Sequence, residues 1–91
     1  MELIIEWDFE KNDRLLKERK VSFEMVVASI ESDKVLGIEA NKSPRGHQQL
    51  LVIVINDYTY VVSFVKDGGK IFLKTIYPSR KFYKKYYENE K

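Results

Sequence analysis

The spacing of hydrophobic residues predicts two helices in the first third of the chain. After Ser22, which can cap a helix, apolar residues recur at the i, i+3, i+4 and i+7 positions of one buried helix face: Phe23, Val26, Val27 and Ile30. The preceding helix, which ends near Arg19, is strongly polar, and Asp8 can accept hydrogen bonds from the free amides at its start. A short strand at residues 3–6 precedes both helices. The expected order of this part is therefore strand, helix, helix.

From residue 34 onward, the hydrophobic pattern takes the period of strands. Four strand-like runs follow one another, at residues 35–39, 47–55, 58–65 and 70–77. The second run is almost wholly apolar from Leu50, which is typical of a central strand covered on both faces. Short turns join the last three runs, so an antiparallel meander is expected. Pro78 ends the last strand, and Ser79 can cap a short helix that follows it.

These elements predict one α+β domain over residues 1–91. It consists of a βαα unit, a four-stranded antiparallel meander and a C-terminal helix, with the helices packed against one sheet. A hydrophobic fraction of 44% and a charged fraction of 33% are typical of a folded globular protein rather than a disordered one. Trp7 and Phe23 are expected in the core, because large aromatic residues dominate small cores.

The chain contains no cysteine, which excludes disulfide bonds and thiolate chemistry. No apolar run approaches the roughly 18 residues that a bilayer-spanning helix requires, and the acidic start MELIIEWDFE does not look like a secretory signal. We therefore expect a cytoplasmic protein without a membrane partner.

Positive charge is concentrated at the C-terminal end. From Lys70 onward there are seven Lys or Arg against two Asp or Glu, a balance of +5, whereas the preceding residues carry nine against twelve, or −3. The net charge of +2 therefore hides a polarised molecule. Cations bind phosphate and aromatic rings stack on bases, so an interleaved series of the two suits an RNA chain. The predicted RNA-binding residues are Lys81, Lys84, Lys85, Tyr83 and Tyr87.

Three short strings, spread over nearly the whole chain, carry a family resemblance. Glu6-Trp7-Asp8, with Lys11 beyond it, looks like an opening EWD…K motif, and Val21-Ser22-Phe23-Glu24 looks like a VSFEEA helix start. The segment from Lys74 to Lys81, with Tyr86 or Tyr87 beyond it, looks like a closing RIISARRA…E…Y segment. In this order the strings resemble the BrnT-like toxins of bacterial type II toxin–antitoxin pairs, members of the RelE-like group of small ribonucleases. The resemblance implies a RelE-like fold, an RNA-cleaving activity and a cognate antitoxin protein that masks the basic surface.

Candidate catalytic residues are those suited to RNA cleavage without a metal ion. A base removes the proton of a 2′-hydroxyl, this oxygen attacks the adjacent phosphorus, and cations stabilise the phosphoryl charge. Arg80 is the first candidate for the phosphate, because its planar fork matches two oxygens and it lies at a helix start; the alternative is a solvated first-turn cation. By strand alternation Lys74 shares a face with Phe72 and Ile76, and it either lines the site or extends to an edge.

His47 is the only histidine, and histidine titrates near neutrality, so it is a candidate general acid or base. Without a visible partner, a surface role is the stronger interpretation. Tyr83, Tyr86 and Tyr87 recur with Phe82 at helical spacing, so part of this set belongs to the core and the remainder can stack on bases. No cluster has the spacing of metal ligands or of a nucleotide-binding loop, and we expect no metal and no cofactor.

Three hypotheses follow from the sequence. The first is a metal-independent endoribonuclease toxin that binds RNA and is silenced by a small antitoxin. The second is a non-catalytic RNA-binding module, a degenerate toxin, and the third is a protein-interaction domain with an acidic partner. An edge strand in so small a sheet can also pair with a second copy of the chain, giving a homodimer, or with an antitoxin strand, giving a hetero-oligomer.

Overall fold

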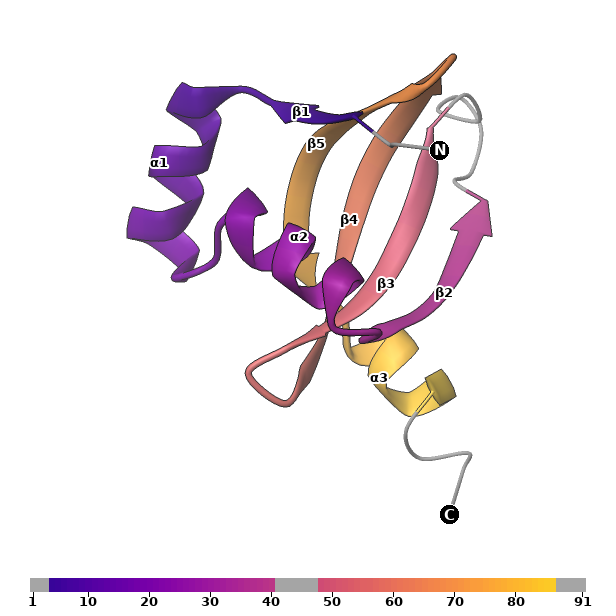
Figure 1. Cartoon of the computed structure of the whole chain (residues 1–91). Helices are drawn as coiled ribbons and strands as arrows, with labels where there is room; N and C mark the ends of the chain where they lie inside the picture. The colour runs from indigo at the N-terminus through magenta and orange to yellow at the C-terminus, as the bar shows by residue number, and fades with distance from the viewer. Residues whose placement is uncertain (1–3, 41–47, 87–91) are drawn as a thin grey trace.

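A five-stranded mixed sheet is the centre of the fold, with the strand order β1-β5-β4-β3-β2 (Figure 1). The computed structural model describes residues 4–40 and 48–86. Along the chain, the elements are β1 (Ile4–Trp7), α1 (Phe9–Arg19), α2 (Phe23–Glu31), β2 (Val35–Ala40), β3 (Gln49–Ile55), β4 (Tyr58–Asp67), β5 (Lys70–Pro78) and α3 (Arg80–Tyr86). The α+β class and the order of these elements agree with the sequence prediction. None of the helices in these ranges has the length and apolar character needed to cross a bilayer.

The sheet differs from the predicted four-stranded antiparallel meander in one respect. Strands β2 to β5 form the expected antiparallel meander, and Asn56 and Asp57 turn between β3 and β4 with positive φ angles of 52° and 63°, as a two-residue hairpin requires. Strand β1 pairs in parallel with β5, which makes the sheet five-stranded and mixed. The meander leaves one edge of β5 unpaired, and β1 joins it there because Ile5 and Trp7 pack on the core from that position.

Helices cover both faces of the sheet. On one face, α1 and α2 supply Leu15, Phe23 and Val26 to the larger core, and α3 lies on the opposite face, where Phe82 packs in a smaller core (Figure 1). As expected for a central strand, β3 contributes to both cores, with Leu51, Ile53 and Ile55 on one side and Leu50 and Val52 on the other.

The predicted helix caps are present. The Asp8 carboxylate accepts hydrogen bonds from the amides of Glu10 and Lys11, at 2.9 and 3.1 Å. The hydroxyl of Ser22 accepts from the Met25 amide at 3.4 Å, and that of Ser79 accepts from the Phe82 amide at 3.3 Å. These caps supply acceptors to amides of the first helical turn, and the Met25 amide donates to the Ser22 carbonyl as well, at 3.1 Å.

A buried polar contact holds α1 against the start of α2. The Asn12 side chain, 7% exposed, accepts a hydrogen bond from the Phe23 amide at 2.7 Å and donates one to Glu24 at 2.7 Å. Trp7 stacks on the fully buried Phe23 with ring centroids 5.8 Å apart, which confirms both aromatic residues as part of the core or packed against it. The junction of the two helices is therefore joined by a side-chain amide as well as by apolar packing.

An irregularity in β5 corrects the predicted surroundings of Lys74. Ser63 pairs with Thr75 but the next residue of β4, Phe64, pairs with Leu73, so Lys74 is an extra residue in a β-bulge. The Lys74 Nζ lies 5.0 Å from the ring centroid of Phe72, as alternation predicted. The expectation that Ile76 shares this face is wrong: Ile76 is fully buried in the α1/α2 core, because the bulge shifts the alternation by one residue.

Candidate nucleic-acid interface

A cleft of about 450 Å³ lies between α3 and residues of β2, β3 and β5, on the sheet face opposite α1 and α2. Strand ends and one side of α3 line this space, which we call the α3 cleft. Its lining residues are Glu39, Ala40, Leu50, Tyr77, Ser79, Lys81, Phe82 and Lys85. Two cations, one carboxylate and two hydroxyl groups therefore share one depression.

Helix α3 is held in place by contacts at both of its ends. Phe82, 8% exposed, packs with Val52 and Val61 of the sheet. At the other end, Tyr86 lies against Gly37 of β2, where a Cβ atom would stand only 2.5 Å from the Tyr86 hydroxyl oxygen. Glycine at this position is what lets the tyrosine ring lie across β2. This packing orients the Lys85 side of the helix toward the cleft.

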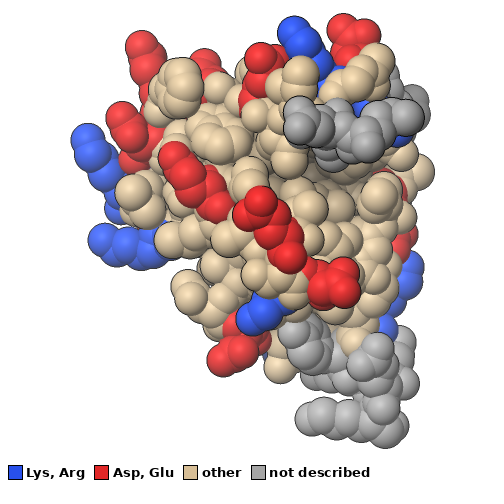
Figure 2. Space-filling view, in the orientation of Figure 1, with Lys and Arg blue, Asp and Glu red and all other residues tan. Residues whose placement is uncertain are grey.

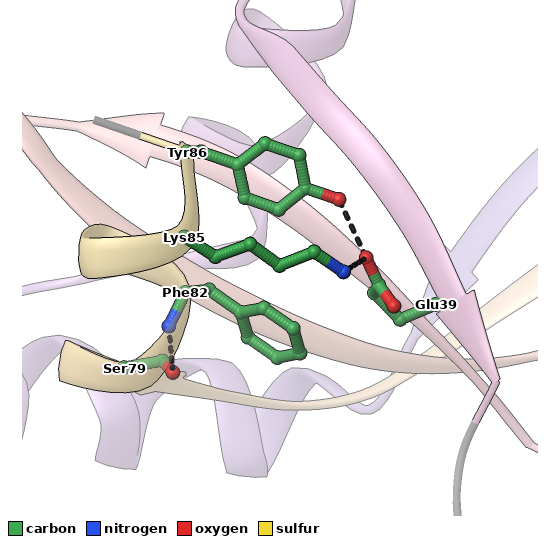
Figure 3. A network of polar contacts seen from close by, with 5 residues as sticks. All are labelled: Glu39, Ser79, Phe82, Lys85 and Tyr86. Carbon is green, nitrogen blue, oxygen red and sulfur yellow. Dashed lines mark hydrogen bonds and ion pairs between the residues drawn. The ribbon is translucent and has the colours of Figure 1, made fainter. Parts of the chain in front are cut away.

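The last turn of α3 is joined to β2 through a single carboxylate oxygen (Figure 3). Glu39 Oε2 accepts hydrogen bonds from Lys85 Nζ at 2.9 Å and from the Tyr86 hydroxyl at 2.5 Å. These bonds, with Lys85 making the larger contribution, lower the pKa of Glu39, and the same carboxylate raises the pKa values of Lys85 and Tyr86. At neutral pH the group therefore holds a carboxylate, an ammonium and a protonated phenol.

Of the predicted RNA-binding residues in α3, Lys81 and Lys85 line the cleft. The Lys81 Nζ lies 5.4 Å from the Phe82 ring centroid, and the Lys85 Nζ is engaged by Glu39. Tyr83 instead stacks on Tyr58, with centroids 4.9 Å apart and an interplanar angle of 17°, so its ring packs beside the start of β4. A phosphate in the cleft would compete with Glu39 for Lys85.

The two cations that the sequence placed in the catalytic set do not line this cleft. Arg80 is exposed at the first position of α3, and since successive helical residues are about 100° apart, positions 80 and 84 fall on the side opposite Phe82. Lys74 is exposed on the bulge of β5, beside Phe72. The catalytic roles of Arg80 and Lys74 and the RNA-binding role of Lys84 remain predictions. His47 and Tyr87 lie outside the described residues.

Sequence reasoning missed Glu39 and Tyr77 as site residues. Tyr77 was interpreted only as the end of a strand, and Glu39 was not among the candidate residues. One local signal exists. Gly37 and Glu39 are two residues apart in a strand and so lie on the same face. On that face the glycine leaves space for a neighbouring side chain and the glutamate supplies a negative charge. Their partner helix begins 41 positions after Glu39, at Arg80, so no local pattern connects them.

Charge is distributed unequally between the two sides of the sheet. Figure 2 looks onto the face that α1 and α2 cover and shows acidic side chains spread across it. By contrast, α3 contains four basic residues and no acidic one. The positive charge of α3 would therefore attract a polyanion to the α3 side of the sheet.

Within the described ranges, no group of three or more His, Cys, Asp or Glu side chains is placed to hold a metal ion. Comparison of the chain with protein-family models, with curated proteins and with solved structures finds no match. The functional interpretation therefore depends on the geometry and charge of the α3 cleft.

Proposed function

We propose that this chain is a metal-independent endoribonuclease of the BrnT-like, RelE-like type, the toxin of a type II toxin–antitoxin pair. The observation that carries the proposal is the convergence of Lys81 and Lys85 with Glu39 and Tyr77 in one cleft. The cations suit a phosphate, the carboxylate can accept a proton, and the phenol can donate a hydrogen bond.

In the proposed reaction, Glu39 accepts the proton of an RNA 2′-hydroxyl, whose oxygen attacks the adjacent phosphorus as the bond to the 5′-oxygen breaks. Lys81 and Lys85 stabilise the charge on the phosphoryl oxygens, and the departing 5′-oxygen takes a proton from water or from the Tyr77 phenol. The products are a 2′,3′-cyclic phosphate and a 5′-hydroxyl end.

The lowered pKa of Glu39 bears on this role, because a carboxylate bound by Lys85 and Tyr86 is a weak base. A phosphate that draws Lys85 away would remove the larger cause of that lowering and make Glu39 more basic. Substrate binding would thus activate the proton acceptor, while positioning and charge stabilisation supply most of the rate enhancement.

The Glu39–Lys85 ion pair also favours a second candidate function. A carboxylate inside the cleft reduces its positive potential and neutralises one of its two cations. This arrangement suits a non-catalytic module that binds RNA weakly, or one that binds an acidic protein.

The decisive experiment incubates purified protein with RNA in EDTA and compares Lys81→Gln with Lys66→Gln. Lys66 lies on the other sheet face, so its replacement makes the same charge change away from the α3 cleft. Cleavage by the wild type and by Lys66→Gln, lost in Lys81→Gln, supports the ribonuclease. Binding of intact RNA that weakens with salt supports the non-catalytic module, and no affinity at low salt leaves the protein-interaction domain. Arg80→Ala tests in the same assay whether that arginine also contacts the phosphate.

The antitoxin is the partner that this proposal requires. A protein that covers the α3 cleft with acidic side chains would displace Glu39 from Lys85 and block RNA at the same time. Its addition should stop cleavage by the wild type.

A further inference from the structure

A second cleft, also of about 450 Å³, runs along β1 at the far edge of the sheet from β2. Its lining residues are Ile5, Glu6, Trp7, Phe9 and Phe72, and we call it the β1 cleft. Phe9 is 77% exposed and Phe72 is 37% exposed. Two phenylalanine rings thus face solvent in one depression of a small protein, where exposed apolar groups in a cluster indicate a binding surface.

Neither ring has a core role that explains its position. Phe9 is the first residue of α1, whose buried residues are Asn12 and Leu15. Phe72 lies on the sheet face opposite the α1/α2 core, next to Glu6 in the β1–β5 register. Phe9 therefore gains little from burial, and Phe72 keeps more than a third of its surface exposed.

Charged groups beside these rings define the chemistry of the ligand. The Glu6 carboxylate lines the cleft and can accept hydrogen bonds from an amino group. The Lys74 Nζ lies over the Phe72 ring, 5.0 Å from its centroid, within reach of the phosphate of a nucleotide whose base packs against Phe72. Aromatic rings with a carboxylate acceptor and a cation close to Phe72 match a nucleotide whose base carries an amino group.

We infer that the β1 cleft binds an unpaired, amino-bearing base, such as adenine, of the same RNA strand that enters the α3 cleft. The inference rests on the proposed function and adds a base-recognition subsite to it. Phe72 and Tyr77 belong to the same strand, five residues apart, so the two clefts lie within about 16 Å of each other along β5. A single RNA strand spans both. Lys74, on the bulge between Phe72 and Tyr77, holds a phosphate on the way.

The chain supplies its own probe for this subsite. Trp7 is the only tryptophan and lines the β1 cleft, so its fluorescence reports whether a base is bound there. A 2′-O-methyl oligoadenylate lacks the hydroxyl nucleophile and stays intact, and an abasic oligonucleotide of the same length presents phosphates alone. Anisotropy of an end label measures overall binding of each probe.

We expect Phe9→Leu and Phe72→Leu each to weaken oligoadenylate binding about 5-fold or more, the range for one base–aromatic stack, and to leave abasic binding unchanged. Glu6→Gln should reduce the preference for oligoadenylate over oligouridylate, because uracil has no amino group. Lys81→Gln should weaken binding of adenylate and abasic probes alike. Circular dichroism of each variant checks that the fold is retained, and the exposure of Phe9 makes its replacement the safer of the two.

Two outcomes would overturn the base subsite while the RNA-binding proposal stands. In the first, oligoadenylate binds without a change in Trp7 fluorescence. In the second, wild type and both leucine variants bind oligoadenylate with equal affinity. The same holds if a peptide, but no oligonucleotide, changes Trp7 fluorescence while anisotropy still reports RNA binding. Absence of binding to every oligonucleotide overturns the subsite and the proposed function together.

Discussion

Glu39 on β2 and Lys85 on α3 are 46 positions apart in the sequence, and a carboxylate oxygen of the first lies 2.9 Å from the ammonium of the second. The same oxygen accepts a hydrogen bond from the Tyr86 hydroxyl. One acidic residue thus joins the C-terminal helix to the sheet and lies among the cations of the proposed RNA site. We therefore expect Glu39 to weaken RNA binding and to promote RNA cleavage.

Glu39→Gln is therefore expected to tighten RNA binding and to slow cleavage. Removing the carboxylate leaves the Lys85 charge uncompensated, which strengthens phosphate binding. Loss of the proton acceptor should lower the single-turnover cleavage rate by about 10²–10⁴. Glu31→Gln, an exposed acidic residue at the end of α2, makes the same charge change elsewhere. An unchanged cleavage rate in Glu39→Gln would show that Glu39 is not the base.

The contact between α3 and β2 should stabilise the protein only within a defined pH range. The pKa of Glu39 is lowered from 4.5 chiefly by Lys85, so its contribution to stability is complete above pH 4.5 and is lost as pH falls through the lowered value. The pKa values of Lys85 and Tyr86 are raised from 10.5 and 10.0 chiefly by Glu39, so their contributions are complete below pH 10 and are lost as pH rises through the raised values.

Urea denaturation of wild type and Glu39→Gln across pH measures this effect. The stability difference between the two proteins should be constant between pH 4.5 and pH 10 and should shrink at both extremes. It should be small and decrease with salt, because solvent reaches both partners of the ion pair. A difference that persists at pH 2 would contradict the charge-based account.

Gly37→Ala is expected to displace Tyr86. The added Cβ would stand 2.5 Å from the hydroxyl oxygen, so the tyrosine side chain must move and its hydrogen bond to Glu39 is lost. The raised pKa of Tyr86 should then fall toward its ordinary value, which a spectrophotometric tyrosine titration detects. Stability should change by only about 1 kcal/mol, because the end of a side chain can yield.

Gly69→Ala is the matched control, since nothing lies within 4 Å of the Cβ it would add. In a Tyr86→Phe background, Gly37→Ala should have no further effect on the titration curve. If Gly37→Ala still shifted the tyrosine titration curve in that background, the shift would not come from Tyr86.

Asn12→Ala should destabilise the protein by about 1–3 kcal/mol. It leaves the buried amide of Phe23 without an acceptor and removes the bond to Glu24. The midpoint of urea unfolding measures the loss, with Lys17→Ala on the exposed side of the same helix as the control. The unfolding midpoints of the two variants should differ clearly. Equal midpoints would mean that Asn12 does not stabilise the contact between α1 and α2.

Much of the fold could be predicted because the interactions that form its elements are local. The caps at Asp8, Ser22 and Ser79 use amides two or three residues away, and the switch from helical to strand period at residue 34 is visible in the side chains themselves. The turn at Asn56 and Asp57 likewise sets the pairing of its own two strands.

The candidate site could be predicted only in part. The basic and aromatic composition of α3 directed attention to this helix, and two of the residues it selected, Lys81 and Lys85, line the cleft. Which of its cations face the sheet depends on how Phe82 and Tyr86 pack, and that in turn depends on space left at Gly37. The bulge at Lys74 likewise arises from the pairing of β4 with β5, and it reversed the expected position of Ile76.

The sequence by itself determined the elements, their order, and a C-terminal helix rich in cations, because each of these follows from residues within a few positions of one another. Only the tertiary structure decided that β1 completes the sheet beside β5, that α3 lies opposite α1 and α2, and that Glu39 meets Lys85. These relationships join residues dozens of positions apart. They are selected by how apolar surfaces fit together in three dimensions, which no local pattern records.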